Sequence, residues 1–429
     1  MKLTHPQVPW PTPNPLSAGR PGPTLLLWYP HRVAGTPLLR VLGLTLAKRA
    51  VLSAQQAGFE RIVIAAHPAD HPGIQAELAD DRVHAQVELD HHPRPTHELA
   101  LALGDRVWTR AALTAIAAPL RGDATLRALV DDARRPTGLF RVGARQLARL
   151  GLEPDRLGEA LSAWPAAALE QVQAGPCVAP VGAGHPLRPA EDLLLQALRK
   201  PADGMISRHI NRHISLAISR RLAKTAVRPN HITAVVAFIG VLSGPLAWYG
   251  GAYWGLALGA LCYYLAAILD GCDGEISRLK ALGSPLGAWL DTITDNVVCL
   301  SFILGAYGRV QADAPGRLWA WVGLVGVGFF LLTLIPRYYV MATRMGSGDY
   351  QKLAATQRAV APSGFGRVVQ GAKDVVFRND FLPFFAFVTA LLGHPGVFLL
   401  PFAVGAVFAA GDAVWPLLQP RPASTQSRA

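Results

Sequence analysis

Four aspartates, Asp270, Asp273, Asp291 and Asp295, lie in the stretch LDGCDGEISRLKALGSPLGAWLDTITDN (residues 269–296), whose neighbouring segments are apolar enough to lie in a membrane. An ionised aspartate near the centre of a bilayer costs about 2.5 to 3.5 kcal/mol, and near the interface it still needs a partner. We therefore expect something cationic at this site.

The spacing groups the aspartates into two pairs, each on one face of a helix. At 100° per residue, Asp270 and Asp273 lie about 60° apart, and Asp291 and Asp295 about 40° apart. Clustered carboxylates suit hard divalent cations, Mg²⁺ or Mn²⁺, rather than zinc. Helix caps or counter-charges for nearby basic residues would explain one or two of the aspartates, but not four. Glycines at 271, 274, 283 and 287 would leave space for a bulky ligand. Arg278 could bind a phosphate oxygen of that ligand.

These residues follow a known order. The chain has Asp270, two residues, Asp273-Gly274, two residues, Ser277-Arg278, eight residues, Gly287, three residues, Asp291, three residues and Asp295. This order resembles the signature of the CDP-alcohol phosphotransferase family of integral membrane enzymes, which usually has alanine at the position of Ser277. The resemblance covers residues 200–418 and includes PNHIT (residues 229–233), which is similar to the family's Pro-Asn-x-Ile-Thr.

The resemblance implies roles for these residues. Asp270, Asp273 and Asp291 would bind two Mg²⁺ or Mn²⁺ ions, and Asp295 would be the base and is also assigned to the metal site. The ions would bridge the pyrophosphate of a CDP-alcohol donor and stabilise the departing CMP while a polar or lipid hydroxyl acceptor attacks. The residues expected to contact the CDP-alcohol are Asn230, Gly274, Ser277, Arg278 and Gly287.

Apolar segments that could form membrane helices follow PNHIT. They cover residues 232–250, 252–270, 286–307, 318–341, 381–393 and 396–418, and the fifth is short. They predict an α-helical membrane domain with six transmembrane helices, residues 229–418. The connector after the fourth segment is rich in Lys and Arg, whereas YGGAYWG and LGHPG have none. The positive-inside rule therefore places the connector, the N-terminal domain and the active site on the cytoplasmic side of the inner membrane.

The composition agrees with a partly embedded protein. Of the 429 residues, 51% are hydrophobic and only 16% are charged. The net charge of +12 would also suit nucleic-acid binding, but the basic residues cluster beside apolar segments, which favours membrane lipids as partners and no nucleic acid. Residues 201–228 combine isoleucines on one helical face with arginines, as expected for a helix on an anionic membrane surface; the alternative is a solvated linker helix.

Residues 24–200 alternate short apolar runs with helical stretches, which predicts an α/β domain with a mainly parallel sheet. TLLLWYP, RIVIAAH and LALALGD are expected strands, and LLRVLGLTLAKRAVLSAQQAG is an expected helix. AGTPLLRV and AGFERIVIAA resemble parts of sugar-phosphate nucleotidyltransferases, and Asp105 stands at the place of a metal-binding aspartate. WYPHR replaces their glycine-rich phosphate-binding loop, so we expect this domain to lack that activity.

A nucleotidyltransferase-like domain joined to a CDP-alcohol phosphotransferase resembles the bifunctional inositol-1-phosphate cytidylyltransferase/di-myo-inositol phosphate phosphate synthases. This arrangement favours inositol phosphate synthesis, although the motif alone suits phospholipid synthesis equally well. Residues 1–23 and 419–429 are expected to be disordered. The sequence does not determine the oligomeric state, and a homodimer is one option.

The acceptor is expected to bind basic residues near the end of the fourth apolar segment. Arg337 follows Pro336, and Arg344 lies two helical turns further, so both could reach the cavity of the aspartates and hold an anionic acceptor such as inositol phosphate. Alternatively, they mark the topology and touch lipid phosphates. A second function, a divalent cation transporter with the aspartates as its ion path, is opposed by their position toward one membrane face.

Overall fold

The computed structural model describes residues 23–29, 35–90, 98–120, 126–132, 136–143, 169–173, 178–182, 185–199, 203–313, 316–345 and 381–418. The chain divides into two compact units, Met1–Ala197 and Leu198–Ala429. The terminal segments that were expected to be disordered lie outside the described residues, apart from Pro23, and so does most of the basic connector.

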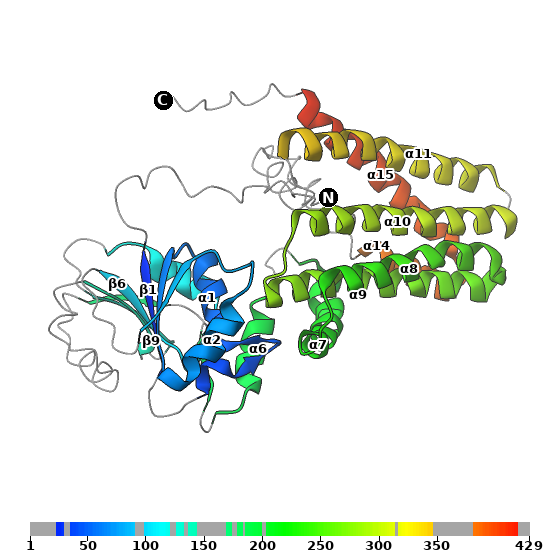
Figure 1. Cartoon of the computed structure of the whole chain (residues 1–429). Helices are drawn as coiled ribbons and strands as arrows, with labels where there is room; N and C mark the ends of the chain where they lie inside the picture. The colour runs from blue at the N-terminus through cyan, green and yellow to red at the C-terminus, as the bar shows by residue number, and fades with distance from the viewer. Residues whose placement is uncertain are drawn as a thin grey trace, which may run out of the picture. The chain divides into compact units, whose positions relative to one another are not determined.

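A seven-stranded sheet forms the centre of the first unit, in the order β10-β8-β9-β6-β1-β4-β5 (Figure 1). Neighbouring strands are parallel except for β9, which is antiparallel to both β6 and β8. The predicted α/β domain with a mainly parallel sheet is therefore confirmed. The strands are β1 Thr24–Trp28, β4 Arg61–Ala65, β5 Gln86–Leu89, β6 Leu99–Leu103, β8 Leu126–Val130, β9 Pro136–Val142 and β10 Leu169–Gln173.

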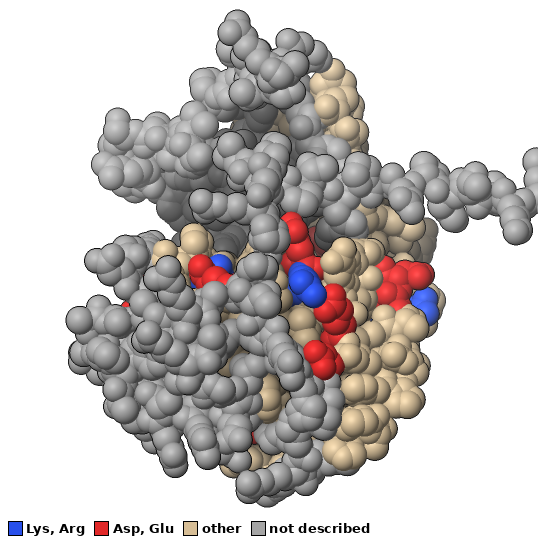
Figure 2. Space-filling model, turned by 60° about the vertical axis from the view of Figure 1, so that its left-hand side comes forward, with Lys and Arg blue, Asp and Glu red and all other residues tan. Residues whose placement is uncertain are grey.

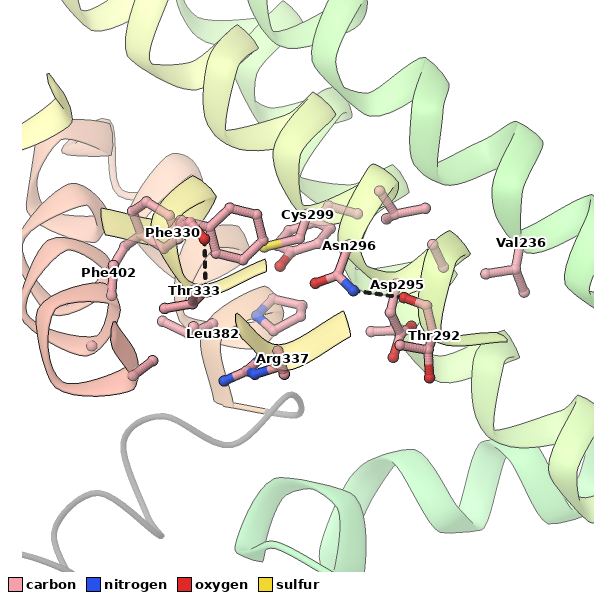
Figure 3. A pocket seen from close by; sticks show the side chains of 18 residues that line it. Val236, Thr292, Asp295, Asn296, Cys299, Phe330, Thr333, Arg337, Leu382 and Phe402 are labelled. Carbon is pink, nitrogen blue, oxygen red and sulfur yellow. Dashed lines mark hydrogen bonds between the residues drawn. The ribbon is translucent and has the colours of Figure 1, made fainter. Parts of the chain in front are cut away.

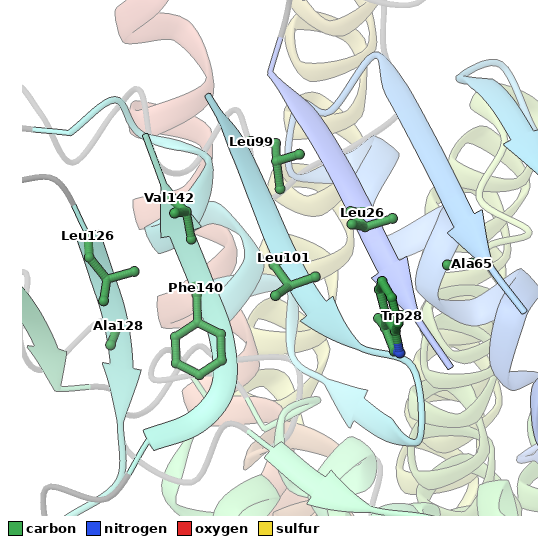
Figure 4. Packing of buried hydrophobic residues seen from close by; sticks show 9 residues of the cluster. All are labelled: Leu26, Trp28, Ala65, Leu99, Leu101, Leu126, Ala128, Phe140 and Val142. Carbon is green, nitrogen blue, oxygen red and sulfur yellow. The ribbon is translucent and has the colours of Figure 1, made fainter. Parts of the chain in front are cut away.

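Alternate residues of the strands build the core on one face of this sheet (Figure 4). Side chains two positions apart point to the same face of a strand, so each strand contributes every second residue. The cluster consists of Leu26, Trp28, Ala65, Leu99, Leu101, Leu126, Ala128, Phe140 and Val142. The other elements of the unit are α1 Leu46–Gln56, α2 His71–Leu78, α3 Arg110–Ala117, α6 Arg188–Gln196, η2 Thr36–Leu38, η3 Pro68–Asp70, and the paired strands β2 Arg40–Val41 with β3 Leu44–Thr45 and β7 Arg106–Trp108 with β11 Val178–Pro180.

The helix expected in LLRVLGLTLAKRAVLSAQQAG begins later than predicted, at Leu46. The preceding residues form the β2–β3 hairpin, whose turn residues Leu42 and Gly43 have φ angles of 46° and 84°. A two-residue turn with positive φ at both positions matches the right-handed twist of a hairpin. The apolar periodicity of these residues was therefore misassigned to a helix.

The second unit is helical. Its elements are the π-helix η5 Ser207–Asn211, α7 Arg212–Ala223, α8 Pro229–Tyr249, η6 Gly251–Gly255, α9 Leu256–Lys280, α10 Pro285–Asp313, α11 Arg317–Val340, η7 Met341–Met345, α14 Phe381–Leu391 and α15 Pro395–Leu418. Figure 1 shows α8, α9 and α10 as long, roughly aligned helices, and α15 beside α11.

Four of the described helices are long and apolar enough to cross a membrane: Pro229–Tyr249, Tyr253–Lys280, Pro285–Asp313 and Arg317–Thr343. Two shorter apolar helices are Phe381–Leu391 and Gly396–Gly411. The unit thus has the helices of an integral membrane protein, and six spans remain a prediction. Close packing holds α8 to α10, since a Cβ on Gly305 would come 2.1 Å from the carbonyl oxygen of Gly244.

Helix α7 buries a small and polar face. Asn211 just before it, and Ser215 and Ser219 within it, are buried, whereas Ile210 and Ile214 are exposed. The buried side of α7 packs on α9, and the isoleucines lie on the exposed side. Their contact with a membrane surface stays a prediction.

Charged side chains on the face shown in Figure 2 form small mixed groups of acidic and basic residues. Ion pairs of the first unit include Arg40 with Glu77 and Arg61 with Glu88. Within the described residues on that face, no broad basic surface of the kind that binds nucleic acid is visible.

Candidate active site

Three of the four predicted aspartates come together between α9 and α10. Asp270, Asp273 and Asp291 each offer a carboxylate oxygen, and these oxygens lie within 4.8 Å of one another. Asp273 is buried and the other two are half-buried. The helical spacing of Asp270 and Asp273 places both on the side of α9 that meets α10, as the sequence predicted.

The chemistry of this cluster fits a divalent cation. Among the described residues, no Lys or Arg forms an ion pair with Asp270 or Asp273, and the buried Oδ1 atom of Asp270 has no hydrogen-bond partner. Carboxylates this close repel one another, and a buried oxygen without a partner is costly. Oxygen ligands at this spacing suit Mg²⁺ or Mn²⁺, which would relieve both costs.

The turn between α9 and α10 has clear local causes. Helix α9 ends at Lys280, and the capping residue Ala281 adopts the left-handed conformation with φ 51° and ψ 47°. Leu282 N–H then donates to the carbonyl of Ser277 at 2.8 Å. Helix α10 then starts with Pro285, and Ser284 Oγ accepts from Gly287 N–H at 3.0 Å. A capping serine followed by proline is a strong helix start. This short connection brings the two pairs of aspartates onto neighbouring helices.

Thr233 of PNHIT supports the cluster and was not predicted. Its Oγ1 donates to Oδ2 of Asp273 at 2.7 Å, and both side chains are buried. The hydrogen bond orients the carboxylate of Asp273 from a residue that lies 40 positions earlier in the sequence. The sequence did contain a signal, because Thr233 lies three residues after Asn230 and so near the same face of α8.

The residues predicted to contact the CDP-alcohol lie around the cluster. A Cβ on Gly274 would come 3.2 Å from Nη1 of Arg278, so the glycine leaves room for that guanidinium. A Cβ on Gly287 would lie 3.7 Å from Oδ1 of Asn230, which brings the starts of α8 and α10 together. Ser277 Oγ lies 3.6 Å from the corresponding position on Gly283.

Asp295 lies one turn beyond Asp291 on α10 and lines a cavity of about 190 Å³ (Figure 3). It does not belong to the three-carboxylate cluster. The lining combines polar side chains, including Thr292, Asn296 and Arg337, with apolar ones such as Phe330 and Phe402. Asp295 is thus placed to contact a molecule in this cavity.

The two predicted acceptor residues differ in what the structure describes. Arg337 lines the same cavity as Asp295 and comes from α11. Arg344 lies in η7, and its side chain is outside the described part of the chain. The structure therefore brings one of the two arginines to the cavity that Asp295 lines.

A buried ion pair holds α7 against the face of α9 opposite the metal cluster. Arg212 Nη1 donates to Oε1 of Glu275 at 2.6 Å, and its Nε and Nη2 donate to Asp203, both at 2.9 Å. Ser215 Oγ also donates to Glu275 Oε1 at 2.7 Å. Glu275 is fully buried, so removing Arg212 would leave an uncompensated charge at a cost of about 3 to 5 kcal/mol.

In the first unit, Tyr29 follows β1 and Asp105 lies just after β6. These two strands are neighbours in the middle of the sheet, and both residues lie at their carboxyl ends, where the strand order reverses. Ligands of open α/β sheets bind at such a position. The ring of Tyr29 packs directly on Gly104, where a Cβ would come within 2.6 Å of it. Burial, followed by the charge of Asp105, raises the pKa of Tyr29 above its usual value. A neutral aromatic side chain therefore fills this position.

Known proteins match the helical unit and part of the first unit. The CDP-alcohol phosphatidyltransferase family matches residues 226–364, which include all four aspartates. A bifunctional IPC transferase and DIPP synthase of Rubrobacter xylanophilus is 30% identical over 332 residues, covering 65% of this chain and 74% of the relative. The chain belongs to the CDP-alcohol phosphatidyltransferase family. Because 65% exceeds the share of the helical unit, the similarity also reaches into the first unit.

Other relatives of this CDP-alcohol phosphatidyltransferase match smaller parts. The bifunctional IPC transferase and DIPP synthase of Thermococcus kodakarensis is 35% identical over 136 residues, which are 32% of this chain and only 29% of that relative. The solved inositol-1-phosphate CTP transferase of T. maritima matches with a TM-score of 0.32 and 14% identity, covering 42% of this chain and 97% of that one. Family membership favours a transferase and gives no support to a cation transporter.

Proposed function

We propose that the chain transfers the substituted phosphate of a CDP-alcohol to a hydroxyl acceptor at a membrane and releases CMP. The observation that carries this proposal is the cluster of Asp270, Asp273 and Asp291, whose oxygens lie within 4.8 Å, one helical turn from Asp295 at the cavity. We further propose six spans in the inner membrane, with the site facing the cytoplasm, membrane lipids as partners and no nucleic-acid partner.

Each of these residues has its own role in the proposed reaction. Asp270, Asp273 and Asp291 would hold two Mg²⁺ or Mn²⁺ ions, which would supply the positive charge that stabilises the pyrophosphate and the leaving CMP. Asp295 accepts the proton of the attacking hydroxyl. The hydroxyl oxygen forms a bond to the phosphorus that carries the alcohol, and the bond from that phosphorus to the CMP oxygen breaks. Arg278 binds phosphate oxygens beside the nucleotide.

Inositol phosphate synthesis is the favoured setting. The relatives named above are bifunctional IPC transferase and DIPP synthases, which supports CDP-inositol as donor and an inositol phosphate as acceptor. The apolar part of the cavity, with Phe330 and Phe402, favours a lipid substrate as a second candidate. We propose that the first unit has no nucleotidyltransferase activity, because the Tyr29 ring occupies the ligand edge of its sheet.

The test is CMP release by the purified full chain in lipid nanodiscs. CDP-inositol and CDP-diacylglycerol serve as donors, with inositol 1-phosphate as acceptor, in Mg²⁺, in Mn²⁺ and in EDTA. We expect release that needs donor, acceptor and metal together. Release in EDTA, or uptake of divalent ions into vesicles without any CDP compound, would contradict the proposal.

Thr233→Val should weaken metal binding without removing a ligand. The substitution keeps the shape of the side chain but deletes the 2.7 Å hydrogen bond that orients Asp273. Groups that orient a metal ligand typically contribute 10- to 100-fold to affinity, so we expect a loss of about that size. Mn²⁺ titration followed by electron paramagnetic resonance measures it. Thr389→Val, whose hydroxyl bonds only within α14, is the control, and equal Mn²⁺ affinities in all three proteins would disprove the role.

Arg337→Ala should raise the KM for inositol 1-phosphate by about 10- to 100-fold, since it removes a charged hydrogen-bond donor from the cavity. The KM for the CDP-alcohol should change little, because the metal site holds the pyrophosphate. Arg344→Ala is expected to act in the same direction. Arg309→Ala, which removes an exposed partner of Asp313 on α10, is the control. Unchanged acceptor KM values in both variants would place the acceptor phosphate elsewhere.

A further inference from the structure

Asn296 follows the proposed base directly and lines the same cavity (Figure 3). Its side-chain nitrogen makes two hydrogen bonds, to the carbonyl oxygen of Thr292 at 2.7 Å and to the hydroxyl of Tyr338 at 3.0 Å. A backbone carbonyl only accepts hydrogen bonds, so the NH₂ group must face Thr292. This contact fixes which way the amide points.

Both hydrogens of the amide nitrogen are therefore used within the protein. Tyr338 is itself held, because its ring stacks on Trp289 with centroids 6.1 Å apart and an interplanar angle of 16°. Rotation of the amide would break the contact with Thr292 and place oxygen against oxygen. Asn296 is therefore a rigidly held group in the lining of the cavity.

The amide oxygen of Asn296 points the other way, toward the middle of the cavity in Figure 3. Within the described residues, no side chain or backbone group donates to this oxygen. The cavity thus presents two acceptors from adjacent residues, the carboxylate of Asp295 and the fixed amide oxygen of Asn296. A ligand that satisfies both needs two hydrogen-bond donors, and two hydroxyls of one molecule can supply them.

We propose that Asn296 selects a polyol acceptor by accepting a hydrogen bond from a second hydroxyl, next to the one that Asp295 deprotonates. The proposal rests on the proposed transferase function and specifies its acceptor class. A simple alcohol, with its one hydroxyl bonded to Asp295, would leave the amide oxygen of Asn296 without a partner. Sites built to bond a hydroxyl discriminate strongly against analogues that lack it.

The test compares two acceptors in two forms of the enzyme. Inositol 1-phosphate is compared with monodeoxy inositol 1-phosphates, each lacking one hydroxyl, using CMP release by the full chain in nanodiscs. We expect the wild type to prefer the full polyol over one of the deoxy compounds by about 10- to 100-fold in kcat/KM. Asn296→Leu should remove that preference by slowing the reaction of the full polyol only.

Thr333→Val is the matched control. Thr333 lines the same cavity, but its hydroxyl donates within α11 to the carbonyl of Phe330 at 2.6 Å. It should keep the preference of the wild type. Acceptor binding measured by calorimetry with the metal present provides a second readout, in which Asn296→Leu should bind the full polyol and the deoxy compound equally.

The outcomes separate the two proposals. If Asn296→Leu slows both acceptors by the same factor, Asn296 has only a structural role and the inference is wrong, while the transferase function stands. If the wild type accepts all deoxy compounds equally, or prefers an acceptor with one hydroxyl, the inference is also wrong. If the wild type releases no CMP with any acceptor, the transferase function fails and the inference fails with it.

Discussion

Asp295→Asn should lower the rate of CMP release by about two to four orders of magnitude, the usual contribution of a positioned general base. The amide has nearly the shape of the carboxylate but cannot take the proton of the attacking hydroxyl. Asp295 lines the cavity and lies outside the cluster of three carboxylates, so the variant should keep most of its metal affinity. The loss should therefore fall on kcat rather than on the KM of the donor.

The control for this variant is Asp313→Asn, at the far end of the same helix. Asp313 is partly exposed and pairs with Arg309, whose Nε donates to its Oδ2 at 2.8 Å. Exposed pairs contribute little, so this variant should retain full activity. Single-turnover kinetics with saturating donor and Mn²⁺ separate chemistry from binding. A rate for Asp295→Asn within a few-fold of the wild type would exclude Asp295 as the base.

The sequence predicted the part of the site that depends on helical period and chain order. Asp270 and Asp273 are three residues apart, so any α-helix places them on one side. The connection from α9 to α10 is too short for these helices to lie far apart. Ser284 and Pro285 mark the start of α10 in the sequence itself. Neighbouring carboxylate pairs therefore followed from local rules.

Contacts between segments that are distant in the sequence could not be predicted from these local rules. Thr233 reaches Asp273 from α8, and Tyr338 reaches Asn296 from α11, and each contact depends on how helices rotate against each other. An amide's orientation depends on partners that only the folded chain supplies.

Helix α7 shows what hydrophobic patterning leaves out. The isoleucines predict the side that faces away from the protein, and Ile214 is indeed exposed, but they do not predict that Ser215 is part of the buried side. The reason is the Arg212–Glu275 pair, because a buried charge must meet its partner and so determines which face of α7 turns to α9. In a membrane protein, apolar side chains lose nothing by facing lipid, so polar contacts decide the packing.

Replacing Asp270, Asp273 or Asp291 with alanine should weaken metal binding by more than about 100-fold, because each variant loses a ligand rather than a residue that orients one. The rate of CMP release should fall as well, and its dependence on Mg²⁺ or Mn²⁺ should move to higher concentrations. These effects differ from those of Asp295→Asn, which should lose rate while metal affinity is largely kept.

Thermal unfolding gives a readout of the same variants that does not need turnover. Three carboxylate oxygens within 4.8 Å repel one another when no cation is present, so each alanine variant should unfold at a higher temperature than the wild type in EDTA. A ligand that binds only the folded state stabilises it by about 2.7 kcal/mol at 100 times its Kd, so Mn²⁺ should raise the Tm of the wild type. The alanine variants should lose most of that rise, and Asp313→Asn should keep it. A wild-type Tm that does not respond to Mn²⁺, or alanine variants that respond as strongly as the wild type, would rule out the three aspartates as metal ligands.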